Sequence, residues 1–262
     1  MTTDLIIRDD TDGVAQLTIN RPEAMNAMNR SVIDRLNEHL DVIDIDESID
    51  VVIITGAGDK AFVAGADIKE LAKRGPLDGL EAYMQRTYDR LGSFSKPLVA
   101  AVNGYAFGGG NELALACDIR VGSTNAQFAL PEAGLGILPS AGGTQRLPNI
   151  VGRGLAADMI ITGRRIDADE ARTVNLITYL VEPEDLLPTA HKVAQRIRRK
   201  GPLAVSLIRQ LLIRGGRVDH ETGILLERLA QSVLFASPEK QEGTEAFVEK
   251  RPADFQSVRH DR

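Results

Sequence analysis

The chain has 262 residues, of which 43% are hydrophobic and 26% charged, a composition that is ordinary for a soluble globular protein. Its formal net charge of −6 argues against nucleic acid or an anionic membrane as the main partner, because both require a basic surface. The sequence shows neither a signal peptide nor an apolar stretch of roughly 20 residues, and its one cysteine, Cys117, excludes an intramolecular disulfide. These features predict a cytoplasmic protein.

The first half of the chain alternates short β-rich segments with helical patterns. Strands are predicted at residues 14–19, 51–54 and 98–102. Helices are predicted from an N-cap at Ser31 to Ile43, over residues 77–91, and over residues 112–116. This alternation predicts an α/β fold whose strands lie in parallel order.

Strands become sparse from about Gly142 onward. Helices are predicted at residues 155–161, 168–173, 188–199, 203–212 and 221–235, with a short final helix from Pro238. We therefore expect an α/β core over residues 1–195 and a helical C-terminal part over residues 196–262. No Pro/Gly/Ser-rich linker separates the two.

Three segments that each follow a strand could carry chemistry. The first, residues 61–70, follows the strand at 51–54 and is rich in small residues around Gly65, which would let a ligand approach the backbone. Asp67 could begin a helix there. The alternative is an ordinary glycine loop followed by a capped helix.

The second segment, residues 103–112, contains the run Gly108-Gly109-Gly110. Three successive glycines cost conformational entropy, so the backbone needs either a positive φ or a close approach at this point. Between a strand and a helix, such a run places free N–H groups at a helix N-terminus, the geometry of an oxyanion site. The alternative is a tight turn packed against a neighbour, with Glu112 only complementing the helix dipole.

The third segment, residues 131–144, places Glu132 in a largely apolar, glycine-broken loop that we expect to run from Phe128 to Pro148. A carboxylate in such surroundings has a raised pKa and can act as a general acid or base near neutral pH. The alternative is a partly exposed loop glutamate without a chemical role.

Together these segments resemble the crotonase (enoyl-CoA hydratase/isomerase) superfamily in residues, order and spacing. The resemblance runs from the turn at Asn20-Arg21-Pro22 to residues 246–251, which is nearly the whole chain. Residues 64–69 and 104–112 carry the superfamily's motifs. The presence of both Glu112 and Glu132 is similar to the hydratase branch.

The resemblance implies a spiral of repeated β-β-α units with a helical C-terminal trimerisation part. It also implies an acyl-CoA thioester as substrate, a homotrimer or dimer of trimers, and neither a metal nor a separate cofactor, because coenzyme A belongs to the substrate. The N–H groups of Ala66 and Gly109 would form the oxyanion hole, and Glu112 and Glu132 would share the catalytic water. The groove for adenine and pantetheine would be lined by Ala64, Ala66, Asp67, Ile68, Lys69 and Gly109, with Phe247 and Lys250 at the nucleotide end, in some relatives across a subunit boundary.

Several alternatives stay open from the sequence. Ser140 stands where many hydratases have glycine and Leu130 where some have a polar residue, which puts substrate and efficiency in question. A double-bond isomerase, a C–C hydrolase or a decarboxylase would use the same stabilised enolate, and a non-catalytic acyl-CoA-binding or RNA-binding role is compatible with the fold. Residues 56–61 fit the pattern G-x-G-x-x-A, but the acidic strand end that a dinucleotide site requires about 20 residues later is missing.

Overall fold

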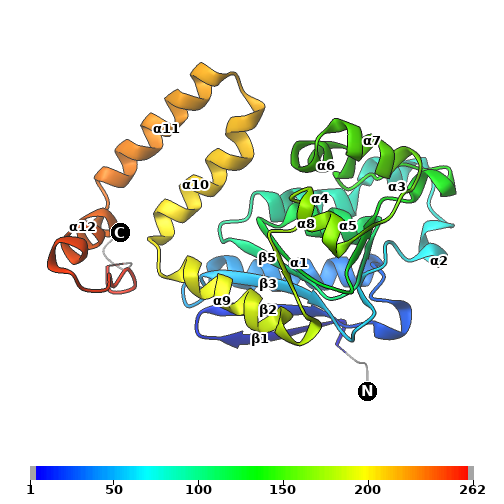
Figure 1. Ribbon diagram of the computed structural model, residues 1–262, viewed down its shortest axis with the longest axis horizontal. Coiled ribbons are helices and arrows are strands. Elements are labelled where there is room, and N and C mark those ends of the chain that lie inside the picture. Colours follow the sequence, from blue (N-terminus) through cyan, green and yellow to red (C-terminus); the bar gives the residue numbers. More distant parts are fainter. Residues whose placement is uncertain (1–3, 259–262) are drawn as a thin grey trace.

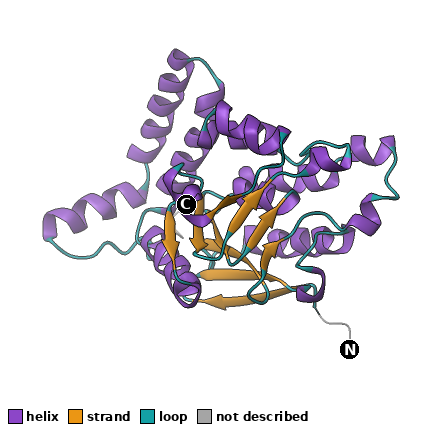
Figure 2. Ribbon diagram, turned by 45° about the vertical axis from the view of Figure 1, so that its right-hand side comes forward, coloured by secondary structure: helices purple, strands orange, loops and turns teal. Residues whose placement is uncertain are grey.

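A computed structural model describes residues 4–258 and contains two β-sheets surrounded by helices (Figures 1 and 2). The larger sheet has the strand order β1-β2-β3-β5-β7-β10, in which all neighbours pair in parallel except β1 and β2. Its strands are Ile6–Thr11 (β1), Val14–Ile19 (β2), Val51–Gly56 (β3), Leu98–Val102 (β5), Ile119–Ser123 (β7) and Tyr179–Val181 (β10).

The smaller sheet has the order β4-β6-β8-β9, with β4, β6 and β8 parallel and β9 antiparallel to β8. Its strands are Ala61–Val63 (β4), Tyr105–Phe107 (β6), Gln127–Ala129 (β8) and Ile166–Asp167 (β9). Three times the chain passes from the larger sheet into the smaller one and then into a helical turn: β3-β4-α2 (α2, Ile68–Leu71), β5-β6-α5 (α5, Gly109–Ala116) and β7-β8-η2 (η2, Glu132–Leu135). The α/β fold with repeated β-β-α units is therefore confirmed.

The central strands β3 and β5 of the larger sheet are buried on both faces. In β3, Val51 and Ile53 pack against helix α9 (Leu186–Arg198), while Val52 and Ile54 face the main core, to which helix α1 (Arg30–Ile45) also contributes. Alternating residues thus enter different apolar clusters, as the period of two along a strand requires. A strand buried on both faces has no polar alternation, which explains its continuous apolar sequence.

Two predicted helices begin or run differently from expectation. Ser31 is not the N-cap of α1, because Asn29, two residues earlier, accepts the hydrogen bond from the Val32 N–H at 2.9 Å. The single helix predicted over residues 77–91 is two helices, Pro76–Glu81 (α3) and Tyr83–Gly92 (α4), separated at Ala82 with φ +49°. The break lets α4 bury its apolar face while α3 stays exposed.

The expected loop between Phe128 and Pro148 is also wrong. It contains the end of β8, the 3-10 turn η2 and most of helix α6 (Gly143–Val151), which accommodates Pro148 inside its span. The helices that follow, Arg153–Ile161 (α7) and Ala168–Thr173 (α8), lie where the sequence predicts them. The glycines of residues 56–61 lead into β4 and not into a helix, so they lack the strand-to-helix turn of a dinucleotide site.

Three helices follow α9: Pro202–Arg214 (α10), His220–Phe235 (α11) and Pro238–Glu249 (α12). Ser237 is the N-cap of α12. Helices α10 and α11 form an antiparallel pair that rises away from the sheets (Figure 1). Buried Arg209 ties α10 to the core, because its guanidinium binds the Asp118 carboxylate at 2.7 Å and the Leu91 carbonyl at 2.6 Å. The division at residues 195/196 falls inside α9 and stays a prediction.

Short 3-10 helices complete the fold at Pro22–Ala24, Pro183–Asp185 and Gly215–Arg217. Within residues 4–258, no helix combines the length and the apolar content that a bilayer span requires.

Candidate active site

A cavity of about 700 Å³ lies where the parallel strands β4, β6 and β8 end. Each strand delivers one segment to it: Ala64 and Ala66 after β4, Gly108 and Gly109 after β6, and Glu132 after β8. The carboxyl ends of parallel strands meet at one edge of a sheet, which is why segments distant in the sequence converge. Segment α3–α4 forms another part of the wall through residues that include Asp78, Ala82, Tyr83, Met84 and Gln85.

The three glycines of the 108–110 run are needed for three different close approaches. Gly108 has φ +51°, and a Cβ there would lie 2.9 Å from Oε1 of Glu132. At Gly110 a Cβ would lie 1.8 Å from the carbonyl oxygen of Val63, so this glycine lets α5 pack directly on β4. At Gly109 a Cβ would lie 3.0 Å from Sδ of Met84, on the wall of the cavity. Packing therefore explains Gly110, whereas Gly108 and Gly109 face the cavity.

Two backbone N–H groups at this wall have no acceptor within the described residues. Gly109 is the first residue of α5, where an amide has no partner within the helix. A Cβ at Gly109 would lie 3.9 Å from the amide nitrogen of Ala66, so the two amides are close neighbours. Among residues 4–258, neither the Ala66 nor the Gly109 N–H donates a hydrogen bond. The pair can bind a single oxygen that carries negative charge.

Glu112 is buried in the first turn of α5, with 2% of its surface exposed. Its Oε1 accepts hydrogen bonds from the N–H groups of Ala141 at 2.7 Å and Gly143 at 2.8 Å. Burial raises the pKa of Glu112, and the two N–H donors, followed by the charge of Arg146, oppose that rise. Since these donors bind the ionised form best, they favour the carboxylate form of Glu112 and offset part of the effect of burial.

Glu132 has a different environment. It begins the turn η2 and is 9% exposed, and its Oε2 is buried with no hydrogen-bond partner in the described part of the chain. Burial raises the pKa of Glu132 to about 7, and the nearby charge of Glu112 adds to the rise. Two carboxylates in one cavity, one stabilised as the anion and one titrating near neutrality, are suited to act as base and acid.

A charged network supports the α2–α4 side of the cavity. Glu70 accepts hydrogen bonds from the Tyr83 hydroxyl at 2.7 Å and from Arg74 at 2.6 Å. The guanidinium of Arg30 lies 4.8 Å from the centre of the Tyr83 ring. These contacts hold Tyr83 and the adjoining Met84 in place, so the segment from Gly75 to Gln85 forms one side of the cavity.

The structure brings most of the sequence-predicted site residues together, but not all of them. Ala64, Ala66, Ile68, Gly109, Glu112 and Glu132 line the cavity, as does Ser140. Asp67 instead caps α2 and pairs with Arg21 at 3.1 Å, and Lys69 is exposed; neither lines the cavity. Phe247, 86% exposed, and Lys250 lie at the end of α12 and do not line the cavity of their own chain.

Sequence reasoning missed the two N–H groups that donate to Glu112. Leu130 is fully buried, and its Cδ1 lies 3.0 Å from where a Cβ on Gly143 would stand. The glycines at 142 and 143 were a usable signal for a close approach, but only the fold shows that the approaching atom belongs to Glu112.

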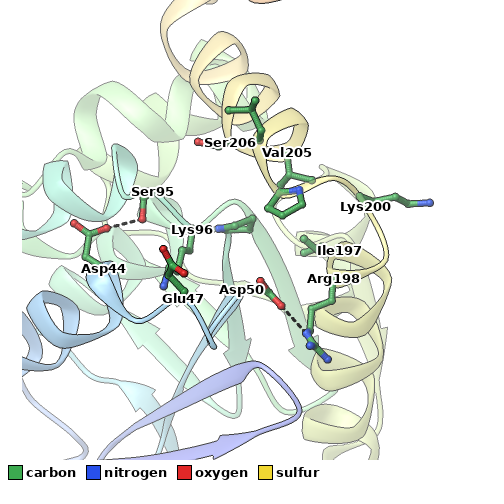
Figure 3. Close-up of a pocket in the computed structure, with 13 residues that line it drawn as sticks. Asp44, Glu47, Asp50, Ser95, Lys96, Ile197, Arg198, Lys200, Val205 and Ser206 are labelled. Atoms are coloured by element: carbon green, nitrogen blue, oxygen red, sulfur yellow. Dashed lines mark hydrogen bonds and ion pairs between the residues drawn. The ribbon is translucent and has the colours of Figure 1, made fainter. Parts of the chain in front are cut away.

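A second hollow, of about 420 Å³, lies where α9 and α10 leave the core (Figure 3). Several of its polar groups already have partners: Asp50 pairs with Arg198 at 2.8 Å, and Asp44 accepts a hydrogen bond from Ser95. It contains neither Glu112 nor Glu132, so the cavity at the ends of β4, β6 and β8 is the candidate active site.

A β-β-α fold that directs two unpaired N–H groups and two buried carboxylates into one cavity defines an enzyme that stabilises an oxyanion while moving protons. The chain belongs to the enoyl-CoA hydratase/isomerase family, whose sequence profile matches residues 9–258. The resemblance predicted from the motifs is thereby confirmed.

Individual relatives cover nearly the whole chain. Crotonyl-CoA hydratase of Syntrophomonas wolfei is 42% identical over 95% of this chain and 97% of its own length. Short-chain-enoyl-CoA hydratase of Clostridium acetobutylicum is 42% identical over 94% and 95%. The crystal structure of an enoyl-CoA hydratase from Bacillus anthracis superposes with a TM-score of 0.93 at 37% identity, covering 96% of this chain and 99% of that one.

Proposed function

We propose that this protein is an enoyl-CoA hydratase, which adds water across the 2,3 double bond of a 2-enoyl-CoA thioester. The observation that carries the proposal is the pair of buried carboxylates, Glu112 and Glu132, facing the same cavity as the unpaired N–H groups of Ala66 and Gly109. Relatives with hydratase activity in their names, over 90% of this chain in each case, support the same reaction.

The chemistry follows from the conjugation of the thioester with the double bond. Water attacks C3, the C2=C3 electrons shift to the thioester oxygen, and an enolate forms. The N–H groups of Ala66 and Gly109 stabilise that negative charge; one such donor is typically worth about 10²–10³ in rate. The enolate then takes a proton at C2, so water has supplied OH to C3 and the product is a 3-hydroxyacyl-CoA. This route requires neither a metal nor a separate cofactor.

The two carboxylates divide the proton transfers according to their environments. Glu112, whose anionic form the Ala141 and Gly143 amides favour, removes the proton from water. Glu132, whose pKa is raised to about 7 by burial, delivers a proton to C2. Before the next turnover Glu112 releases the proton taken from water and Glu132 takes one up, which restores both starting states. Such positioned acid–base groups contribute about 10²–10⁴ in rate.

The proposal is tested with purified protein and crotonyl-CoA. Hydration removes the conjugated double bond, so the ultraviolet absorbance should fall and 3-hydroxybutyryl-CoA should appear by mass spectrometry. An unchanged absorbance with bound thioester would indicate a binding protein, and double-bond migration in a 3-enoyl-CoA without hydration would indicate an isomerase; either result would overturn the proposal. A panel of thioesters of different length and branching then identifies the acyl group.

The acid role of Glu132 predicts a pH dependence. Because the raised pKa of Glu132 is about 7, the proton that it must deliver is present below that pH and is lost as pH rises through it. In the free enzyme, kcat/KM should therefore fall by about tenfold per unit on the alkaline side of about pH 7. Constant kcat/KM up to about pH 9 would contradict this division of roles.

We further infer that the chain assembles as a homotrimer or a dimer of trimers. Helix α11 exposes the apolar side chains of Leu225, Leu229, Val233 and Phe235. A large exposed apolar patch of this kind is typical of a protein–protein interface. Light scattering at micromolar concentration should give three or six times the 28.4 kDa chain mass, and a monomer would contradict the inference. Contact of Phe247 and Lys250 with the nucleotide of a neighbouring subunit, and the predicted cytoplasmic location, belong to the same proposal.

A further inference from the structure

Arg146 of helix α6 occupies the space behind the candidate active site. Its side chain is mostly buried, and its Nη1 donates to the carbonyl of Ala141 at 2.9 Å. Ala141 is the residue whose own N–H binds Oε1 of Glu112 at 2.7 Å. One peptide segment therefore separates the guanidinium from the carboxylate, with the carbonyl of Ala141 fixed on one side and its amide on the other.

The backbone of this segment is shaped around the guanidinium. Gly142 has φ +107°, and a Cβ at that position would lie 1.9 Å from Nη1 of Arg146. Gly143 continues the segment, and a Cβ there would lie 3.1 Å from Oε1 of Glu112. The two glycines thus allow the chain to pass between Arg146 and Glu112, touching both.

The other nitrogen of the guanidinium holds helix α4. Nη2 of Arg146 donates to the carbonyl of Tyr88 at 3.2 Å and to the carboxylate of Asp89 at 2.6 Å. One turn earlier, α4 carries Met84, which stands over Gly109 in the cavity wall. A planar guanidinium with its donors in a fixed fork can hold both walls at once, which a lysine ammonium cannot reproduce.

We propose that Arg146 is a positioning residue for the reaction: it fixes the 141–143 segment, and through it Glu112, relative to the wall formed by α4. The inference rests on the proposed hydratase function. Misplacing a reacting group by about 1 Å can cost about 10²-fold in rate, so a residue outside the cavity can matter this much. Arg146 does not line the cavity and contacts no substrate atom in this role.

The charge of Arg146 offers a second, independent readout. The titratable groups that interact electrostatically with Glu112 come from three elements: Arg146 of α6, Glu132 of η2 and Tyr88 of α4. Of these, only Arg146 is positive, and it lowers the pKa of Glu112 against the larger effect of burial. Removing it should raise the pKa of Glu112, so the acid-side fall of kcat/KM should move to higher pH.

The test uses the full-length protein with three substitutions. Arg146→Met removes the donors and the charge but keeps a long stem, Arg146→Lys keeps the charge without the fork, and Asp89→Asn removes only the ion pair, whose carboxylate is 62% exposed. Arg146→Met should lower kcat for crotonyl-CoA by about 10-fold to about 10²-fold, with binding of saturated butyryl-CoA changed by less than about threefold. Arg146→Lys should restore the pH profile but not the full kcat, and Asp89→Asn should stay near wild type.

Carbon-13 NMR of labelled glutamates, with the Glu112→Gln spectrum for assignment, measures the Glu112 pKa without activity. An upward shift of the Glu112 pKa in folded Arg146→Met supports the role of Arg146. This holds even if the wild type does not hydrate crotonyl-CoA, because that result would contradict only the proposed function. Wild-type kcat and an unshifted Glu112 titration in folded Arg146→Met would overturn the role of Arg146. Equal losses in kcat and butyryl-CoA affinity would also overturn it, because they indicate a general loss of structure.

Discussion

Exchange of Glu112 or Glu132 for Gln is expected to lower kcat for enoyl-CoA hydration by at least about 10²-fold, with the fold intact. The reasons differ. In Glu112→Gln the amide oxygen can still accept the Ala141 and Gly143 hydrogen bonds, but the group can no longer remove a proton from water. In Glu132→Gln the buried site keeps its volume and loses the proton that it would deliver to C2.

A matched control is available on the surface. Glu38 of α1 is an exposed glutamate that pairs with Arg35 one turn away, so Glu38→Gln should leave kcat within about twofold of wild type. Steady-state rates with crotonyl-CoA, together with thermal unfolding of each variant, make the comparison. If the two carboxylates act as one unit, the double variant should lose little more than the worse single one. Near wild-type turnover from either single variant would show that its carboxylate is not part of the reaction.

The segments that carry the site were predictable because their cause is local. Three glycines between a strand and a helix indicate that another atom approaches the backbone closely there or that φ is positive. A raised pKa can be predicted from the sequence alone for a glutamate in an apolar segment interrupted by glycines. The structure supports both interpretations at Gly109 and Glu132, and adds that Gly110 serves packing against Val63.

The surroundings of Glu112 were not predictable, because they depend on contacts between distant segments. Its two N–H donors lie 29 and 31 residues further along the chain. No local sequence pattern predicts that the segment containing Ala141 and Gly143 folds back onto α5. The break at Ala82 has the same origin: residues 77–91 form a plausible continuous helix by period alone, and tertiary packing of Tyr83, Met84 and Tyr88 decides against it. Short strands such as β4 and β6 owe their identity to pairing with each other.

The other large effect is expected at Gly109, where the N–H of the backbone and the lack of a side chain can be separated. Gly109→Ala adds a Cβ that meets Sδ of Met84 at 3.0 Å, a flexible neighbour that can move by a few tenths of an ångström, and it keeps the N–H. Gly109→Pro adds a Cβ at the same place and removes the N–H, at the first helical position, where proline is ordinarily tolerated. The difference between these two variants therefore reports the loss of the N–H together with the ring carbons that proline places at the amide nitrogen.

Gly109→Pro should lose at least about 10²-fold more kcat than Gly109→Ala, because one oxyanion donor is typically worth about 10²–10³ in kcat. Affinity for saturated butyryl-CoA should be similar in the two, since a donor that acts on the enolate contributes more to the transition state than to the ground state. Combining Gly109→Ala with Met84→Ala should recover activity that crowding alone removed. If Ala and Pro lose kcat equally while both remain folded, Gly109 is only a steric allowance in the thioester groove, and Ala66 is left as the single donor to the enolate.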